Sequence, residues 1–383
     1  MAPRAGDGRL SRAEAGPITT GMAGSPANEH LPWWSWVLPA AGWAALAALH
    51  GATGPLALVL AAALVGTVFA AVHHAEVVAH RLGEPFGTLV LALAVTVIEV
   101  GLIVSVMLAD PVGKAALARD TVFAVIMLVL NGLVGLCLVL GGARHHEQGF
   151  QARGASAFLA VLVAQATLVL VLPNYTTSAE GPHYAPVQLG FVAVVSLVLW
   201  LVIVFVQTVR HRDYFLPAPD RDSEGDHAEP PPAQAAWISF GLMVAALAAV
   251  VLMGKGLTPA LEGGLAAAGA PAALVGVAIA AIVLLPESIA AVRAARRNRL
   301  QTSLNLALGS ILASIGLTTS AVAVLALALR APLTLGLDPA KTVLLVLSFA
   351  VAILTLAGGR TTVLQGAVHL VIFATWLFLI FVP

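Results

Sequence analysis

Two glutamates lie in segments that otherwise hold no charged residue. The chain contains 19 Lys and Arg and 19 Asp and Glu residues, and among them only Glu99 and Glu287 fall inside long apolar stretches. Placing a carboxylate at the centre of a bilayer costs about 2.5–3.5 kcal/mol on insertion scales, so such a residue is a candidate for function. Glu99 and Glu287 are therefore predicted to bind cations or protons within the membrane.

Polar residues that could complete a cation site follow each glutamate. Pro286 directly precedes Glu287, and a proline within a helix leaves one backbone carbonyl free as a ligand. Hard cations take about six to eight oxygen ligands, which amide and hydroxyl groups can supply. Four residues on the next apolar stretches are predicted to support the site: Asn131, Asn305, Ser310 and Ser314.

The elements that must position these residues are membrane helices. Of 383 residues, 60% are hydrophobic and 10% are charged, a composition that a water-soluble core of this size does not require. Runs of about 20 apolar residues, the length that crosses a bilayer, recur along the chain. The predicted spans are 34–49, 56–72, 86–109, 121–140, 155–172, 187–206, 237–253, 271–292, 304–329, 342–357 and 363–381.

The spans predict an all-α integral membrane protein of about eleven helices. Because the two glutamates occupy similar places in the two parts of the chain, we expect two inverted-topology repeats around a midplane cation site. Residues 1–32 are predicted to be a disordered cytoplasmic tail, and 33–209 the first half with helices one to six. Residues 210–235 are predicted to be an acidic, proline-rich cytoplasmic linker, and 236–383 the second half with helices seven to eleven. The linker could also collect cations weakly.

Lys and Arg residues are distributed unequally between the two sides of the predicted membrane. With the N-terminus inside, the outer segments hold five of the nineteen: Lys114, Arg119, Lys255, Arg330 and Lys341. The other fourteen are cytoplasmic, as the positive-inside rule requires. This distribution predicts a multi-pass protein of the bacterial inner membrane, with a cytoplasmic N-terminus and a periplasmic or extracellular C-terminus.

A second group of titratable residues follows the second predicted helix. It comprises His73, His74, Glu76, His80 and Glu84. Histidine titrates near neutral pH, so this group could form a cytoplasmic vestibule or a proton relay; alternatively, it caps the helix at the interface. His369, within the last apolar stretch, could likewise relay protons or only bond a neighbouring helix.

Other functional classes fit the sequence less well. The spacing of His74, Glu76 and His80 differs from the His-Glu-x-x-His pattern of zinc proteases, which disfavours a membrane enzyme. A channel is disfavoured because a single carboxylate pair with a broken helix suits an occludable site. The one cysteine, Cys137, allows no internal disulfide. No cofactor is expected, and the expected partners are the lipid bilayer and inorganic cations, not nucleic acid.

Several stretches resemble the bacterial calcium/proton antiporters of the cation/calcium exchanger superfamily. They are residues 74–88 with the sequence HAEVVAHRLGEPFGT, 98–100 (IEV), 285–287 (LPE), 305–318, and 359–369 (GRTTVLQGAVH). The resemblance implies two repeats, each with an essential acidic residue that binds the ion, and by position these residues are Glu99 and Glu287.

The resemblance also implies an activity. We expect a secondary antiporter that exports Ca²⁺ in exchange for H⁺, with Glu99 and Glu287 alternately binding the metal and protons. The wider superfamily often has a Gly-Asn pair a few residues before each acid, where this chain has Val95-Thr96 and Val283-Leu284. Exchange of Na⁺ or K⁺ for H⁺ by the same carboxylates therefore stays open as an alternative.

Overall fold

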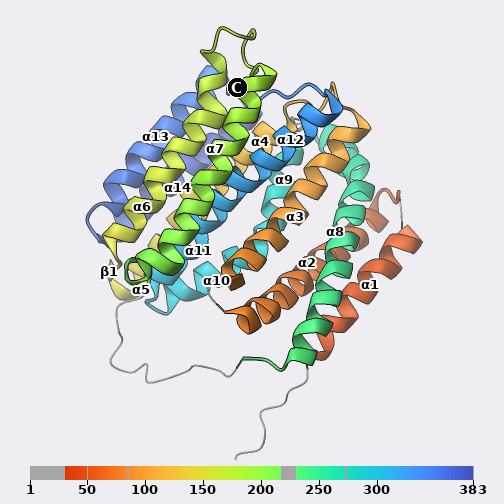
Figure 1. The fold of residues 1–383 in the computed structure, drawn as a ribbon, viewed down its shortest axis with the longest axis horizontal. Helices are drawn as coiled ribbons and strands as arrows, with labels where there is room; N and C mark the ends of the chain where they lie inside the picture. The colour runs from red at the N-terminus through yellow and green to blue at the C-terminus, as the bar shows by residue number, and fades with distance from the viewer. Residues whose placement is uncertain (1–30, 50, 84–85, 217–229, 272–273, 383) are drawn as a thin grey trace, which may run out of the picture. The chain divides into compact units, whose positions relative to one another are not determined.

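Helices make up nearly all regular structure in the part of the chain that the structure, a computed structural model, describes: residues 31–49, 51–83, 86–216, 230–271 and 274–382 (Figure 1). In chain order they are α1 (Trp33–Leu49), α2 (Pro55–Leu82), α3 (Phe86–Ala109), α4 (Leu117–Ile126), α5 (Val134–His145), α6 (Ala152–Ala166), α7 (Pro186–Phe205), α8 (Ala233–Ala267), α9 (Leu274–Val283), α10 (Leu285–Arg296), α11 (Leu300–Ala313), α12 (Thr319–Leu329), α13 (Pro339–Leu356) and α14 (Val363–Phe381). The predicted tail and the centre of the predicted linker lie outside these residues.

The helices combine into about eleven membrane spans, as predicted. Among the described residues, nine continuous helical stretches are long and apolar enough to cross a membrane, and the pair α9 and α10 forms a tenth span bent by 60°. Helix α1 has 17 residues, at the short end of the range that spans a bilayer. Four of the described spans contain π-helical segments. Met127–Leu133 joins α4 to α5 and Ser314–Thr318 joins α11 to α12, whereas Thr167–Val171 and Val206–Arg210 follow α6 and α7.

Two spans are longer than the hydropathy pattern predicts. Helix α2 has 28 residues, where the sequence predicts 56–72, and α8 has 35, where it predicts 237–253. Polar residues at the ends of an apolar run lower its hydropathy without breaking the helix. Helix α2 ends only before Gly83, whose φ of 67° is the left-handed conformation that glycine adopts without strain. His73, His74, Glu76 and His80 therefore lie on the helix itself.

Two spans form the centre of the helical bundle. In the spans α4–α5 and α11–α12, 78% and 72% of the 18 most apolar consecutive residues are buried. In the other continuous spans the share is 22–44%. The remaining helices surround this pair and expose many large apolar side chains on their outer faces. Exposed apolar surface of this extent fits a lipid surround.

The two halves of the chain pack across one another. Helix α14, the last of the chain, packs against α5, and α7, the last span of the first half, packs against α12. Each contact depends on a glycine in a π-helical segment, because a Cβ at Gly132 would meet the Phe373 ring and one at Gly316 would meet Trp200. The same device therefore recurs in both halves, as expected of a repeat.

The buried apolar residues form two clusters. Helices α1, α2 and α8 pack together on one side of the bundle (Figure 1) and share one cluster with parts of α3 and α9. The other cluster surrounds the two central spans. Helix α3 contributes to both clusters, with Ile98 and Leu102 in the first and Ile103 and Val106 in the second. The helix that carries Glu99 thus lies at the junction of the two clusters.

Short contacts join the loops on one side of the bundle, which we call the basic side because Arg81, Arg144, Arg153 and Arg293 lie there. Strand β1 (Gln148–Gly149) pairs antiparallel with β2 (Arg360–Thr361) and joins the loops before α6 and α14. The Gln148 amide donates hydrogen bonds to the Ala295 carbonyl and to Asn298 Oδ1 at 2.9 and 3.0 Å. The end of α10 is therefore fixed to the α5–α6 loop.

Candidate cation and proton site

Glu99 is enclosed by the bundle. It lies in the middle of α3 with 2% of its surface exposed, and its Oε2 accepts a hydrogen bond of 2.7 Å from the Ser314 hydroxyl. Its Oε1 is buried without a hydrogen-bond partner among the described residues. Ser314 is the first residue of the π-helical segment between α11 and α12. From this position the Ser314 hydroxyl points at the Glu99 carboxylate of α3. Ser314 thus lies where it would support a cation site at Glu99.

Glu287 lies at the break between α9 and α10. Pro286 occupies the first turn of α10, where its missing N–H is not needed for helix bonding. The bend of 60° at this point places Glu287 in the first helical turn, where the partial positive charge of the helix N-terminus favours an anion. Its Oε2 is buried without a hydrogen bond among the described residues.

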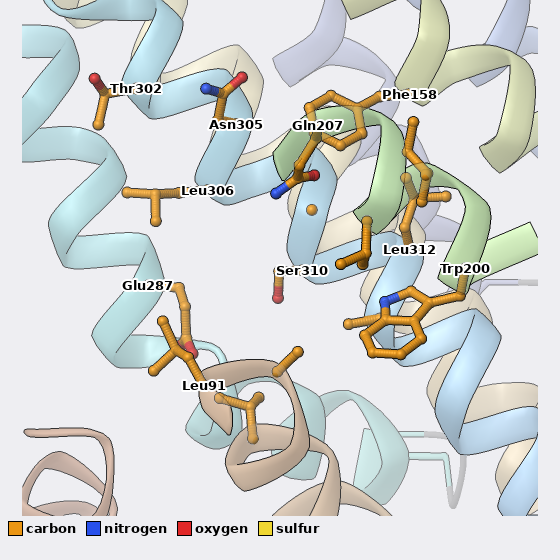
Figure 2. A pocket seen from close by; sticks show the side chains of 16 residues that line it. Leu91, Phe158, Trp200, Gln207, Glu287, Thr302, Asn305, Leu306, Ser310 and Leu312 are labelled. Carbon is orange, nitrogen blue, oxygen red and sulfur yellow. The ribbon is translucent and has the colours of Figure 1, made fainter. Parts of the chain in front are cut away.

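A cavity of about 270 Å³ adjoins Glu287 (Figure 2). Ser310 and Asn305, both predicted to support the site, also line it. The Ser310 hydroxyl faces the cavity between Glu287 and Trp200 (Figure 2). Asn305 is partly engaged elsewhere, since its amide donates to the Phe215 carbonyl at 2.6 Å and its Oδ1 accepts from Gln301 at 2.9 Å.

Glu287 and Glu99 have different neighbours, but α3 and α11 run from the cavity beside Glu287 to the neighbours of Glu99. Val95 and Ser310 line the cavity, and Glu99 and Ser314 follow each of them by four residues. One helical turn rises about 5.4 Å, so the Glu99–Ser314 pair lies one turn beyond the cavity. Within the described residues no group of three or more potential metal ligands is preformed. The site therefore has two places, one at Glu287 and one at Glu99, each with a single carboxylate.

Neither carboxylate has a cationic partner in the part of the chain that the structure describes. The ion pairs there involve Lys114, Arg119, Lys341 and Arg360, all near helix ends or in loops. A buried carboxylate without a countercharge costs several kcal/mol, about 3–5 kcal/mol where one partner of a buried pair is removed. A proton or a bound cation at each glutamate would remove this cost.

Removal of the Ser314 hydroxyl tests its support of Glu99. A hydrogen bond to a charged group contributes about 1.5–3 kcal/mol, so we expect Ser314→Ala to raise the half-saturating cation concentration by about tenfold. The matched control is Ser320→Ala, because the Ser320 hydroxyl bonds the carbonyls of Ala193 and Gly316 instead. Initial rates of cation-driven proton movement at varied cation concentration measure the effect. Equal half-saturation in both variants would exclude this role for Ser314.

The histidine and glutamate group of α2 is divided by the structure. His74 is fully buried and bonds Ser239 Oγ at 3.2 Å and the Ser35 carbonyl at 2.9 Å, so it joins α1, α2 and α8. The His73 ring packs on Trp34, with ring centroids 4.7 Å apart. His80 is exposed near the end of α2, whereas Glu84 lies outside the described residues.

Glu76 is the member of this group that lies near the candidate site. It is exposed on α2, which contacts α10, and it is close enough to Glu287 for the two carboxylates to interact electrostatically. Like charges in this arrangement raise the local concentration of cations at the mouth of a cleft. Glu76 thus remains a candidate for the entrance to the site.

Asn131 and His369 belong to a different polar network. The Asn131 amide donates to Ser348 Oγ at 2.8 Å, and its Oδ1 accepts from His369 Nδ1 at 3.1 Å. His369 Nε2 lies 3.2 Å from the Thr355 hydroxyl. These contacts satisfy both ring nitrogens with neutral partners, and the network joins the first central span to α13 and α14. Its geometry is that of a helix-to-helix hydrogen-bond network.

Loss of His369 is therefore expected to affect stability more than transport. His369→Leu leaves Asn131 Oδ1 and the Thr355 hydroxyl buried without this partner, at a cost of about 1–3 kcal/mol each. We expect a lower melting temperature in detergent and an unchanged half-saturating cation concentration. Thr375→Ala on the exposed face of α14 is the control, because Thr375 bonds only the Val371 carbonyl within its own helix. Lost exchange with unchanged melting would favour a proton relay.

Some polar groups near the site are not among the residues predicted from the sequence. Thr318 lies near Glu99 on the same π-helical segment as Ser314, and its buried hydroxyl has no hydrogen bond among the described residues. Gln165 is fully buried, donates to the Ser196 carbonyl at 2.8 Å and lies against Gly316. Gln165 is the one amide of the apolar stretch 155–172, so its position could have been noted from the sequence, whereas only burial in this fold distinguishes Thr318.

Charged residues pair with one another at the ends of several spans on the side opposite the basic side. Lys114, in the loop between α3 and α4, forms an ion pair with Glu262 near the end of α8. Asp120 bonds Arg119 at 2.9 Å and lies 3.6 Å from Lys341 at the start of α13. These contacts hold the ends of several spans together on the side opposite the basic side.

Comparison with known proteins assigns the fold to a family. The sequence profile described as "Sodium/calcium exchanger protein" matches residues 54–209 and again 238–382. The chain belongs to the sodium/calcium exchanger family. Because one profile matches twice and each match contains five spans, an odd number, the second repeat of this exchanger is inverted relative to the first. The family consists of transporters, so the enzyme alternative does not apply, and the antiporter class is confirmed.

Relatives of this exchanger extend over nearly its whole length. It is 50% identical over 361 residues to the putative ionic transporter y4hA of Sinorhizobium fredii, covering 93% of this chain and 98% of that one. It is 35% identical over 342 residues to the sodium-potassium/proton antiporter ChaA of Escherichia coli, covering 87% and 92%. The solved structure of the H⁺/Ca²⁺ exchanger CAX shares its fold with a TM-score of 0.67 at 15% identity, covering 90% of this chain and 86% of that one.

Proposed function

We propose that this exchanger moves a cation out of the cytoplasm in exchange for protons, using Glu99 and Glu287 as the groups that bind both. The observation that carries the proposal is the pair of buried carboxylates that have free oxygens and lack a cationic partner among the described residues. Such groups are stable only with a proton or a cation attached, so the two ligands exclude one another.

Mutual exclusion couples the two fluxes. A transporter that changes access with both carboxylates empty and charged would bury uncompensated charge, whereas the protonated or cation-bound forms are close to neutral. Only the loaded states therefore cross between the two sides. Ser314, Thr318 and Ser310 are the neutral oxygen ligands that we assign to the bound cation, since they lie beside Glu99 or face the Glu287 cavity.

We assign the basic side to the cytoplasm, with the N-terminus cytoplasmic and the C-terminus on the other side. The excess of Lys and Arg at this side supports the assignment. In this orientation we assign Glu76 to the entrance to Glu287 and the region of the Lys114–Glu262 ion pair to the exit. Cations would thus enter past Glu76, pass Glu287 and Glu99, and leave between α3, α4 and α8.

We propose Ca²⁺ as the transported cation, because two carboxylates balance its charge. Na⁺ or K⁺ is a second candidate, favoured by the 35% identity to ChaA, which is named a sodium-potassium/proton antiporter. A monovalent ion would need one carboxylate and the neutral hydroxyl oxygens, which the Glu99–Ser314 pair offers. The two candidates differ in the number of protons needed for an electroneutral exchange, two for Ca²⁺ and one for a monovalent ion.

Inverted membrane vesicles with an acid interior and a fluorescent pH probe test the proposal. Ca²⁺, Na⁺, K⁺ and Mg²⁺ are added separately, and we expect Ca²⁺ to release protons from vesicles that contain the exchanger but not from matched vesicles without it. A response to Na⁺ or K⁺ alone would replace the cation and keep the mechanism. No response to any of the four would contradict the proposed exchange.

A further inference from the structure

The cavity beside Glu287 is larger and more apolar than a metal ion requires. Its volume of about 270 Å³ compares with about 30 Å³ for a water molecule in the liquid. Carbon-rich side chains form most of its wall, among them Leu91, Val95, Phe158 and Trp200. Glu287 is its one charged residue within the described chain. Apolar walls supply no ligands to an inorganic cation. They are suited to contact with the apolar part of a larger ligand.

The polar groups of the cavity are too few to complete the ligand shell of a metal ion without Glu99, Ser314 and Thr318, which lie beyond it. Apart from Glu287 they are Gln207, Thr302, Asn305 and Ser310. Both ends of the Asn305 amide are bonded to protein groups, which removes it as a free ligand. Divalent ions such as Ca²⁺ need about six to eight oxygens. The cavity instead combines one anionic group with a broad apolar surface.

Two fixed aromatic rings lie across the cavity from the carboxylate. Glu287 is on one side and Trp200 and Phe158 are on the other, with Ser310 between them (Figure 2). Trp200 packs against Gly316, and Phe158 makes an edge contact with Phe215 at 5.0 Å between ring centroids. Both rings are therefore held in place before a ligand enters. Aromatic faces attract cations and apolar groups alike.

We propose that this cavity binds organic monocations, that is, an ammonium or amidinium group on a small aromatic or alkyl body. The cationic group would pair with Glu287, and the apolar body would lie between Leu91 and Val95 of α3 and Trp200 of α7. Such a ligand neutralises the buried carboxylate and removes apolar wall from water in the same step. The organic cation would compete with inorganic cations for Glu287, and this expectation rests on the proposed function. Binding of the organic cation by itself does not depend on that function.

Calorimetric titration of the full chain in lipid nanodiscs tests the inference with 2-phenylethylammonium as the probe. We expect saturable binding to the wild type, and at least tenfold weaker binding of the neutral isostere 2-phenylethanol and of ethylammonium. Glu287→Gln should weaken binding of the probe at least tenfold, whereas Glu99→Gln should change it less than twofold. Trp200→Leu should weaken it about fivefold while ethylammonium binding stays unchanged. Circular dichroism and melting curves confirm that each variant is folded.

Each alternative result has a distinct meaning. Equal binding of 2-phenylethanol would show a general apolar cavity and overturn the inference, as would equal losses in the Glu99 and Glu287 variants. No saturable heat in nanodiscs would show that lipid fills the cavity or that the probe does not enter, and would also overturn it. Because the titration requires no transport, probe binding without proton exchange in vesicles would contradict the proposed function and leave this inference intact.

Discussion

Glu99→Gln and Glu287→Gln are each expected to reduce cation-driven proton exchange by about 100-fold or more, because loss of one charge from a buried pair of opposite charges costs about 3–5 kcal/mol. Glutamine keeps the size and the hydrogen-bonding capacity of the side chain but can neither bind the cation by charge nor release a proton. A permanently neutral residue therefore resembles the protonated state at every pH. Proton release from acid-loaded inverted vesicles on addition of the transported cation measures the loss.

The control for both variants is Glu147→Gln. Glu147 is an exposed residue of the α5–α6 loop, and its ion pair with Arg360 is solvent-exposed, where such pairs contribute about 1 kcal/mol or less. We expect full exchange from this variant. Normal proton-coupled exchange by either Glu99→Gln or Glu287→Gln, with the protein present in the membrane, would contradict the proposed mechanism.

A cross-link between positions 114 and 262 is expected to stop exchange almost completely. The Lys114–Glu262 ion pair joins the α3–α4 loop to α8 on the side opposite the basic side, and both side chains are partly exposed. If cations leave there, these segments must separate in every cycle. The single native cysteine, Cys137, is buried and can be replaced by alanine, which leaves cysteines at 114 and 262 as the reactive thiols.

A short bifunctional thiosulfonate is the suitable reagent, because two long side chains form the ion pair and a direct disulfide requires Cα atoms about 4.4–6.8 Å apart. Exchange should fall after cross-linking and return on reduction. A monofunctional reagent of similar size should leave most of the activity, since it labels both sites without joining them. Full exchange by a quantitatively cross-linked protein would exclude this region as the exit.

The sequence predicts the two carboxylates because their signal is local. A charge in an apolar run of membrane length is costly, and Glu99 and Glu287 are recognisable without knowledge of the neighbouring helices. The signal for the break at Glu287 is similarly local, since Pro286 removes one backbone hydrogen bond there. The number of spans also follows from hydropathy, although the ends of α2 and α8 do not, because a helix continues through polar residues that follow its apolar part.

The partners of the carboxylates are not predictable in the same way. Asn131 and Ser314 are both polar residues on central spans, yet Ser314 bonds Glu99 and Asn131 bonds Ser348 and His369. The difference depends on which helices pack together and on two π-helical segments that rotate the following residues by part of a turn. Ser348 and Thr318 have no distinguishing neighbours in the sequence, so their contacts depend on the tertiary structure.

The crossed packing of the two halves has a consequence for biogenesis. The span that ends in α5 finds its partner α14 more than 200 residues later in the chain, and Gly132 meets Phe373 only when the last span has been made. Contacts of such high sequence separation form slowly and late. The nascent chain must therefore hold its early spans in the bilayer, incompletely packed and dependent on assembly factors or lipid, until translation ends.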